Sequence, residues 1–378
     1  MAFVKKTRYL LAPPYCKSVE TFIIPITGSP SEVLGGLKLA GGWRHFKNLR
    51  IIQKRNNSFV EVRMSINEFI KVAKNFSKTS LTEAEFQIEN LVINRVPFAS
   101  LDMSKPHIMG VINITPDSFY KNSQVKNLKQ LTKIFSEMVN NGASIIDIGG
   151  ESSRPGAEKI SVVKEKQRVV GPIEQLKSCK INSLISLDSR NLSTMKACHK
   201  VGVDIFNDIT AFKEKNKINF ITKTFSPIII MHMQKEPINM QINPKYNFAP
   251  IDIYKFFSKK ITDLIRAGVK KSNIVIDPGI GFGKTLFDNL KILEYLPLLH
   301  GLGVPILIGV SRKSFIGELT NVDLKSRGKN KKLIEPSKRL SGSLAFAIHA
   351  NMSGVQIIRT HDVFETNQAL ICHKSLSL

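Results

Sequence analysis

Hydrophobic and polar positions alternate on two different scales along the chain, and the change falls near residue 105. From Pro106 onward, short runs rich in Ile and Val are separated by segments long enough for helices. This rhythm is typical of βα units, whose parallel strands are covered by helices. Eight runs fit the pattern: 108–113, 143–150, 184–189, 204–209, 227–233, 273–279, 305–311 and 355–361. Because a (β/α)8 TIM barrel requires eight strands, we predict an α/β barrel domain over residues 105–378.

Residues 1–104 follow a different pattern, which predicts a small α+β extension in front of the barrel. NSFVEVRMS (57–65) alternates as a strand does, and SINEFIKVAKNF (65–76) has the spacing of an amphipathic helix. Ser65 and Glu68 are spaced to form a capping box at the start of this helix. No part of the extension has the pattern of an active site, so its role stays open.

The eight runs share a second feature, because each is apolar at its start and polar at its carboxyl end. The polar residues are Asn113, Asp147, Asp188, Asn207 with Asp208, His232, Asp277, Ser311 with Arg312, and Arg359 with His361. A single strand-end Asp or Asn often only caps the next helix. In a barrel, however, all carboxyl ends meet on the catalytic face, so eight polar ends predict a site there.

A doubly wound open sheet is the competing fold. No G-x-G-x-x-G sequence follows the first strand, and eight units exceed the usual number for that fold. The barrel is therefore favoured. Within it, the lone His232 is expected to pack or to orient a loop rather than to act as a base.

Two loops have the composition of anion-binding sites. The first, GGESSRPGAE (149–158), combines glycines and serine hydroxyls with Arg154 on a Pro-Gly turn. The second, GVSRKSFIG (309–317), places Arg312, Lys313 and Ser314 in the first turn of a helix that Ser311 is positioned to cap. A helix N-terminus with two cations and hydroxyls suits an oxyanion or a carbonyl oxygen.

The last strand adds a third anion-binding group. Arg359 and His361 are alternate residues and therefore face the same side of the strand. In a closed barrel the first strand, which ends at Asn113, is their neighbour. Mg2+ prefers oxygen ligands together with phosphate and water, so these residues predict a site for a polyphosphate and Mg2+.

A group of opposite character is formed by Asp188, Asn207 and Asp277. Carboxylates and an amide in a barrel mouth suit the edge of a planar, donor-rich heterocycle, and Lys313 could donate to a ring carbonyl. For the two carboxylates, an acid/base dyad or a glycosidase pair stays open, because only their separation decides between these roles.

The net charge of +25 does not indicate a nucleic-acid partner. Lys is scattered along the whole chain among abundant Ile and Asn, and no RNP, zinc-finger or basic-helix pattern accompanies it. Small-molecule substrates are expected instead.

Targeting signals and cysteines bear on the compartment. No apolar stretch approaches a membrane-spanning length, and the patch before Pro13 is too short for a secretory signal. The four cysteines lie far apart without metal-ligand spacing, which fits a reducing compartment. We expect a cytoplasmic protein without a membrane partner. An organelle transit peptide is the alternative, since the first acidic residue is Glu20.

Short motifs in a fixed order carry a family resemblance. They are NITPDSF, DIGGESSRPGA, LDS, FNDI, MHMQ, DPGIGFGK, GVSRKSFIG, RLSGS and IIRTHD. Over nearly three quarters of the chain, this set resembles the dihydropteroate synthase family of the folate pathway. The resemblance implies a TIM barrel that joins 6-hydroxymethyl-7,8-dihydropterin diphosphate to 4-aminobenzoate by SN1-like loss of pyrophosphate. It also implies Mg2+ as cofactor and a homodimer.

The resemblance further implies a role for each matching residue. The pterin ring would be bound by Asp188, Asn207, Asp277 and Lys313. Mg2+ and pyrophosphate would be bound by Asn113, and the diphosphate by Arg359 and His361. The aminobenzoate side would be lined by Ser153, Arg154, Pro155, Phe282 and Ser314. Catalysis would fall to Asn113, Arg154, Lys313, Arg359 and His361.

The chain departs from the family pattern in two places. Lys121 stands where the family usually has an Asp in the first loop, which bears on loop closure and rate. The segment 321–340 is longer than usual, and its Lys/Arg run predicts a solvated loop. Residues 1–104 lie outside the core motifs and do not resemble the pyrophosphokinase that some fused homologues carry.

Two alternative functions stay open. A catalytically silent paralogue would keep the fold as a pterin-binding or scaffold protein. A pterin-dependent methyltransferase would share the pterin carboxylates but would not need the Ser-Arg-Lys and Arg-x-His groups, which are present here. Release of pyrophosphate from the pterin substrate separates these functions from the synthase.

Overall fold

Eight parallel strands form the centre of the molecule. The computed structural model describes residues 4–6, 20–55, 58–114, 128–151, 159–179, 181–326 and 334–376. The strands are β6 His107–Asn113, β7 Ala143–Gly149, β8 Leu184–Asp188, β9 Ile205–Asp208, β10 Ile228–Met231, β11 Ile274–Asp277, β12 Leu307–Gly309 and β13 Ile357–Thr360. The eight predicted runs are thereby confirmed as strands.

The sheet closes into a barrel. Its order is β11-β10-β9-β8-β7-β6-β13-β12, with every neighbouring pair parallel. A bridge between Ile276 of β11 and Ile306, just before β12, joins the two ends. This closure excludes the doubly wound open sheet and confirms the TIM-barrel prediction.

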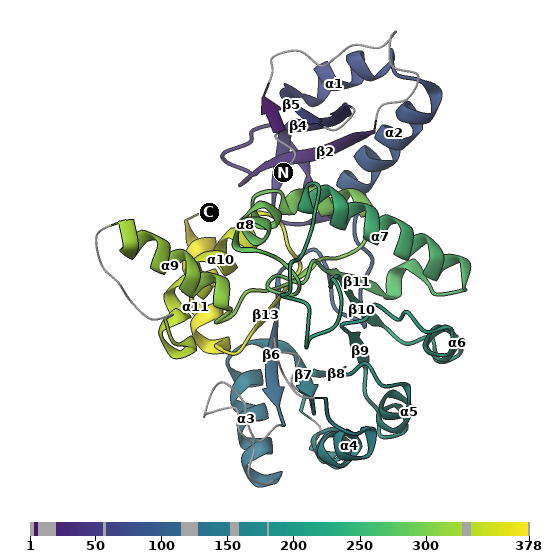
Figure 1. The fold of residues 1–378 in the computed structure, drawn as a ribbon, viewed down its shortest axis with the longest axis vertical. Helices are drawn as coiled ribbons and strands as arrows, with labels where there is room; N and C mark the ends of the chain where they lie inside the picture. The colour runs from purple at the N-terminus through teal and green to yellow at the C-terminus, as the bar shows by residue number, and fades with distance from the viewer. Residues whose placement is uncertain are drawn as a thin grey trace.

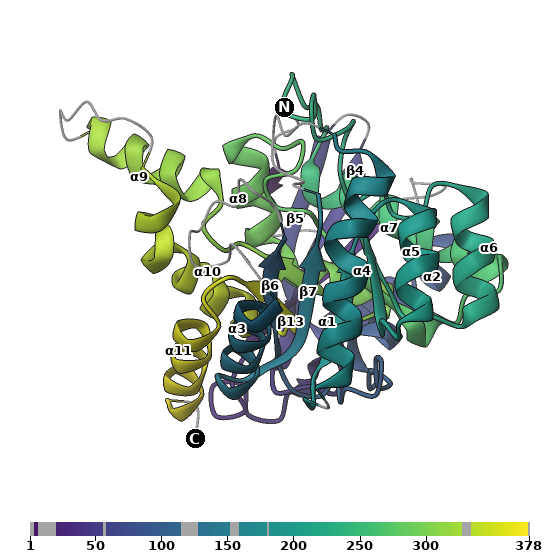
Figure 2. The ribbon, with the colours of Figure 1, turned by 90° about the horizontal axis from the view of Figure 1, so that it is seen from below.

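Helices surround the strands as an outer ring (Figure 1). They are α3 Leu128–Asn140, α4 Val162–Ser178, α5 Leu192–Lys200, α6 Lys215–Thr224, α7 Ala249–Arg266, α8 Leu286–Glu294, α9 Ser314–Ser326, α10 Leu340–Met352 and α11 Val363–Ser375. Short 3-10 segments are η1 Leu39–Gly41, η3 Lys271–Asn273, η4 Leu296–Leu302 and η5 Pro336–Arg339. In Figure 2, α9 extends furthest from the strands. No helix in the described ranges has the length and apolar character to cross a membrane.

The interior of the barrel changes from apolar to polar along the strands. The first layer is Met109, Ile145, Ile205, Ile229, Val275, Leu307 and Ile357, and Phe98 and Met103 pack with it. Two residues further along the same strands come Val111, Asp147, Ser186, Asn207, Met231, Asp277, Gly309 and Arg359. Because side chains alternate across a strand, this second layer faces the same interior. The strand ends therefore place polar groups inside the barrel mouth.

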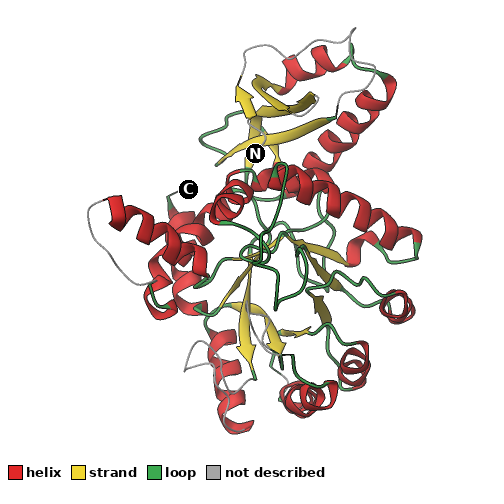
Figure 3. Cartoon of the chain, in the orientation of Figure 1, coloured by secondary structure: helices red, strands yellow, loops and turns green. Residues whose placement is uncertain are grey.

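The N-terminal extension is a second sheet with its own helices (Figure 3). Its strands are β1 Val4–Lys6, β2 Thr21–Gly28, β3 Leu37–Lys38, β4 His45–Arg55 and β5 Ser58–Ser65, in the order β1-β5-β4-β2 with β3 beside β4. Its helices are α1 Ile66–Ala73 and α2 Lys78–Val92. The predicted strand and helix are confirmed, including the capping box, in which Glu68 N donates to Ser65 Oγ at 3.2 Å.

The two faces of this sheet pack against different partners. Ile23 and Ile51 face a core formed with α1 and α2. Their neighbours Phe22, Ile24 and Ile52 belong to the core of the barrel. The period-2 alternation of a strand thus fixes the extension onto the barrel. Its division from the barrel at residue 104 stays a prediction, and Phe98 and Met103 already contribute to the barrel interior.

The segment 321–340 differs from the prediction of a solvated loop. Residues up to Ser326 continue α9, and Pro336–Arg339 form a 3-10 turn. Arg339 is buried, where its Nη1 donates to the Arg312 carbonyl at 3.0 Å. The prediction of a loop was therefore wrong for these two ends of the segment, because composition does not reveal which cations find buried carbonyl partners; for the Lys/Arg run between them it stays a prediction. Residues 327–333 lie outside the described ranges.

Candidate active site

Most of the predicted site residues meet in the upper layers of the barrel interior. The second layer contains Asn207, Asp277 and Arg359, and one layer further toward the mouth lie Asn113, Asp188 and His361. Asn207 and Asp277 are nearly inaccessible to solvent. Strands that are distant in sequence therefore bring together the residues predicted to bind an anion and those predicted to bind a heterocycle.

Arg359 has partners that its predicted role did not include. Its Nε donates to Asp147 Oδ2 at 2.7 Å, and its Nη2 donates to Asp188 Oδ2 at 3.1 Å. Burial alone would lower the pKa of Arg359, but the two carboxylates outweigh it and raise the pKa. The guanidinium thus sits between the predicted diphosphate side and the predicted pterin side.

Asp147 is the principal residue for which sequence reasoning assigned no role. It is fully buried, and besides Arg359 it accepts from Asn207 Nδ2 at 3.1 Å. Its Oδ1 has no hydrogen-bond partner among the described residues. The signal was available, because Asp147 lies two residues after the interior Ile145. The sequence identified Asp147 as a polar strand-end residue, but its role depends on Arg359 and Asn207, which come from strands distant in the sequence.

The two predicted pterin carboxylates hold their protons more tightly than free Asp does. Burial, followed by the nearby charge of Asp147, raises the pKa of Asp188 to about 7. Burial also raises the pKa of Asp277, although the Lys313 ammonium opposes it. The Oδ1 of Asp277 accepts from Gly279 N at 2.7 Å, which fixes this carboxylate at its strand end.

Lys313 lies close enough to Asp277 for their charges to interact. Its Nζ donates to the Ile280 carbonyl and lies 4.7 Å from the ring centroid of Phe282. Burial lowers the pKa of Lys313 to about 8, and Asp277 limits this shift. Ser314 follows as the first residue of α9. Lys313, Asp277 and Phe282 therefore form one wall of the site.

Arg312 does not belong to the anion-binding group that the sequence predicted. Its φ is +56°, and its guanidinium turns to Asp362, with Nε to Oδ2 at 2.9 Å and Nη2 to Oδ1 at 2.5 Å. The left-handed backbone reverses the direction of the side chain relative to Lys313. Only one of the two adjacent cations thus faces the site.

Ser311 and His361 are neighbours just beyond the ends of β12 and β13. Ser311 Oγ and His361 Nδ1 are 3.1 Å apart, and His361 N donates to Ser311 Oγ at 3.2 Å. Asn113 Oδ1 lies across Gly149 from the Cβ of Asp188, since a Cβ built on Gly149 would stand 3.6 Å from each. His361 and Asn113 thus lie one layer closer to the barrel mouth than Arg359.

His232 packs as the sequence predicts. Its ring is 4.9 Å from that of Phe256, and its Nδ1 is 3.1 Å from Lys284 Nζ. Burial lowers the pKa of His232 well below its usual value, so it is neutral. It borders a cavity of about 640 Å³ that contains none of the predicted ligands and lies between the loops after β10 and β11.

Some predicted residues cannot be compared with the structure. Ser153, Arg154 and Pro155 lie outside the described residues, as does Lys121. Within the described ranges, no group of three His, Cys, Asp or Glu side chains is arranged to hold a metal ion.

Comparison with known proteins gives a consistent result. The model of the family described as "Pterin binding enzyme" matches residues 109–361. Dihydropteroate synthase of Escherichia coli K12 is 41% identical over 72% of this chain and 92% of the relative. The Bacillus subtilis enzyme of the same name is 35% identical over 72% of this chain and 89% of its own length.

Solved structures of the same name match the fold. Yersinia pestis dihydropteroate synthase with a sulfonamide drug complex has a TM-score of 0.67 at 38% identity, over 73% of this chain and 96% of that one. The Xanthomonas albilineans enzyme with 4-aminobenzoic acid has a TM-score of 0.64 at 33% identity, over 73% of this chain and 94% of that one. The barrel is therefore similar to these relatives in both sequence and fold.

Proposed function

The chain belongs to the dihydropteroate synthases, and from this premise we propose how its own residues divide the reaction. It is a transferase of folate biosynthesis that condenses 6-hydroxymethyl-7,8-dihydropterin diphosphate with 4-aminobenzoate, giving 7,8-dihydropteroate and pyrophosphate. The observation that carries the assignment of roles is the polar interior layer around Arg359, Asp188 and Asp277.

The pterin ring is bound by Asp188, Asn207, Asp277 and Lys313 in this proposal. Carboxylates accept from the amino and ring N–H groups of the heterocycle, and the Lys313 ammonium donates to its ring carbonyl. The raised pKa values of both carboxylates support it, because buried acids whose pKa is shifted by burial and by neighbouring charges are typical of ligand sites. Asn207 and Asp277 lie in the second interior layer and Asp188 lies one layer closer to the mouth, so the ring would bind between these two levels.

The diphosphate is held by Arg359 and His361. Arg359 already bridges Asp147 and Asp188, so an incoming diphosphate takes its Nη2 from Asp188 while Nε stays with Asp147. Charge-assisted bonds of guanidinium to phosphate stabilise the negative charge that develops as the C–O bond breaks. Asp188 is then freed to accept from the pterin.

Asn113 is the proposed metal ligand. Its amide oxygen is a hard donor at the rim, and no carboxylate cage stands beside it within the described ranges. This donor set fits Mg2+, which is commonly held by one or two protein oxygens together with phosphate and water. When bound, Mg2+ supplies positive charge to the departing diphosphate.

Bond formation needs little from a protein base. Loss of pyrophosphate takes the C–O bonding electrons and leaves a methylene cation that the electron-rich pterin stabilises. The amine of 4-aminobenzoate then forms the C–N bond with its lone pair and releases one proton to solvent. Phe282 and Ser314, with the predicted Ser153, Arg154 and Pro155, line the side from which this amine approaches.

The test of this function is turnover by the full chain. The purified protein with both substrates and Mg2+ should release pyrophosphate and form dihydropteroate in equal amounts. Binding of the pterin without any product would support the silent paralogue instead. Methyl transfer from a methylated folate to a corrinoid protein would support the methyltransferase.

Assembly and compartment are further proposals. We expect a homodimer, which light scattering should report as twice the 42.3 kDa of the chain. We also place the enzyme in the cytoplasm. The free thiols of Cys179, Cys198 and Cys372 support a reducing compartment.

A further inference from the structure

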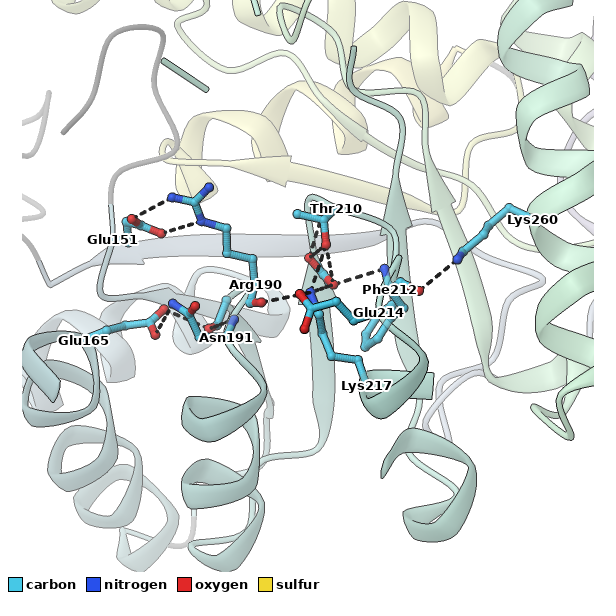
Figure 4. Close-up of polar contacts among 11 residues, drawn as sticks. Glu151, Glu165, Arg190, Asn191, Thr210, Phe212, Glu214, Lys217 and Lys260 are labelled. Atoms are coloured by element: carbon cyan, nitrogen blue, oxygen red, sulfur yellow. Dashed lines mark hydrogen bonds and ion pairs between the residues drawn. The ribbon is translucent and has the colours of Figure 1, made fainter. Parts of the chain in front are cut away.

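A network of charged residues lies behind the ends of β7, β8 and β9 (Figure 4). Three of its members adjoin predicted substrate ligands in the sequence. Glu151 precedes the loop of Ser153 and Arg154, Arg190 follows Asp188 by two residues, and Asp208 follows Asn207 directly. No role had been assigned to the two cations that join them, Arg190 and Lys217.

Lys217, in the first turn of α6, joins the loops after β8 and β9. Its Nζ donates to Asp208 Oδ2 at 3.0 Å, to Thr210 Oγ1 at 3.0 Å and to the Arg190 carbonyl at 2.9 Å. The side chains of Lys217 and Asp208 are 1% and 0% exposed. A buried ammonium is retained only with such partners, so its position is strongly determined.

Asp208 organises the loop that follows Asn207. It accepts from Thr210 N at 2.8 Å and from Phe212 N at 3.1 Å. Ala211 and Phe212 have φ values of +54° and +51°, a left-handed conformation that costs free energy in residues with a Cβ. The charged contacts of Asp208 with Lys217 offset this cost and hold the loop in one conformation.

Arg190 connects the same network to the loop after β7. Its Nε and Nη2 donate to Glu151 Oε2 at 3.0 Å and Oε1 at 2.9 Å, with both side chains largely buried. Glu151 Oε1 also accepts from Ile160 N at 3.3 Å, so one carboxylate holds residues 151 and 160 together. The Arg190 guanidinium therefore holds Glu151 and, through it, Ile160, whereas the Arg190 carbonyl accepts from Lys217.

The residues around Arg190 are fixed from the other side by α4. Ser189 Oγ donates to Glu165 Oε1 at 2.8 Å, and Asn191 Nδ2 donates to Glu165 Oε2 at 2.9 Å. Ser189 N also donates to the Asn207 carbonyl at 3.1 Å, which couples the ends of β8 and β9. Lys217, Glu165 and the Asn207 carbonyl therefore hold the segment that follows Asp188 from three sides.

We propose that Lys217 and Arg190 are positioning residues for the two substrates. Lys217 fixes the spacing between Asp188 and Asn207, and so acts on the pterin diphosphate. The Arg190 guanidinium fixes Glu151 and, through it, Ile160, between which the predicted aminobenzoate residues lie in the sequence, and so acts on 4-aminobenzoate. This inference rests on the function proposed above.

The test is a separation of Michaelis constants. Lys217→Met should raise the KM for pterin diphosphate about tenfold and leave that for 4-aminobenzoate within about twofold, since small misplacements weaken binding strongly. Arg190→Gln should instead raise the KM for 4-aminobenzoate about tenfold and leave that for pterin diphosphate within about twofold. Calorimetric titration with pterin diphosphate alone should give the same loss of affinity for Lys217→Met.

Arg50→Met is the matched control, because it removes a buried ion pair far from these loops. Arg50 Nη2 lies 2.9 Å from Glu61 Oε2, with side chains 11% and 1% exposed. It should lower thermal stability as the Lys217 variant does without changing either KM. If Lys217→Met does not fold, Lys217→Met/Asp208→Asn removes both charges and is expected to show the same rise in KM.

Three results would overturn the proposal. They are unchanged KM values in a folded Lys217 variant, equal rises for both substrates, or the same pattern in the Arg50 control. Absence of turnover by the unmodified chain would instead contradict the proposed function itself, so the two failures are distinguishable.

Discussion

Two of the buried arginine–carboxylate groups lie in different regions, one in the barrel interior and one at the contact between extension and barrel. In the interior, Arg359 joins Asp147 and Asp188. At the contact, Arg50 donates to Glu61 through Nε at 3.0 Å and Nη2 at 2.9 Å, and lies 4.1 Å from the ring centroid of Tyr295. The same chemistry thus appears in two different settings.

The difference lies in what the carboxylates have left to bind. Both oxygens of Glu61 are engaged, since Tyr295 Oη also donates to Oε2 at 2.8 Å. Asp147 keeps an oxygen without a partner among the described residues, and the pKa of Asp188 is raised to about 7, first by its burial. A saturated pair stabilises a fold, whereas an incompletely satisfied one can exchange partners with a substrate.

Arg359→Ala should give the largest effect. It removes the cation that stabilises the departing diphosphate, so kcat/KM should fall about a thousandfold. Affinity for the pterin diphosphate should fall far more than affinity for the free pterin, as measured by calorimetric titration with both. Equal losses for the two ligands would remove the anion-binding role.

Asp277→Asn should give the next largest effect. The carboxylate accepts from ligand donors, and an amide replaces one of its acceptors with a donor. Loss of a charge-assisted bond costs about 2 kcal/mol, or roughly thirtyfold in pterin affinity. Titration with the free pterin measures it directly, and an unchanged Kd would contradict the heterocycle assignment.

The pH dependence of kcat/KM should be bell-shaped and narrow. Asp188 must be ionised to accept, and its pKa is raised to about 7 by burial and by Asp147. Lys313 must be protonated to donate, and burial lowers its pKa to about 8. The value of kcat/KM should therefore fall below about pH 7, as Asp188 is protonated, and above about pH 8, as Lys313 loses its proton in the free enzyme.

Variants assign the two limbs of this profile. Asp188→Asn should remove the acidic limb, because an amide does not titrate. Lys313→Arg should remove the alkaline limb, because a guanidinium stays protonated throughout this range. Limbs that persist in both variants would show that other groups control the profile.

Arg50→Met should have the smallest effect on catalysis. It leaves Glu61 buried without its cation, so the free energy of unfolding should fall by about 3 kcal/mol. The kinetic constants should stay unchanged, because Arg50 contacts only the extension, Glu294 and Tyr295 among its described partners. Denaturant unfolding measures the free energy of unfolding, and steady-state kinetics on the same preparation measure kcat and KM.

The sequence predicted the barrel and which polar residues lie in its interior, because both follow from short-range periodicity. A polar residue at the carboxyl end of an apolar strand run is predicted to lie at the barrel mouth, as for Asp188 and Asp277. The side-chain partners of such residues depend on the order of the strands in the sheet. The bridge from Arg359 on β13 across β6 to Asp147 on β7 was therefore not predicted. It could be found only once the strand order was known.

Lys217 shows a second limit of sequence reasoning. In KNKINFITKT the three lysines look alike, yet only Lys217 is buried against an Asp. Arg312 shows the converse, since a cation inside an anion-binding motif turns away because its backbone is left-handed. Local composition does not determine which way a cation points.

A structure of the enzyme with 6-hydroxymethyl-7,8-dihydropterin diphosphate tests the central claim most directly. We expect the pterin ring to contact Asp188, Asn207, Asp277 and Lys313. We also expect Arg359 Nη2 to have moved from Asp188 to the diphosphate. A ring bound elsewhere, or an Arg359 that keeps both carboxylates in the complex, would contradict it.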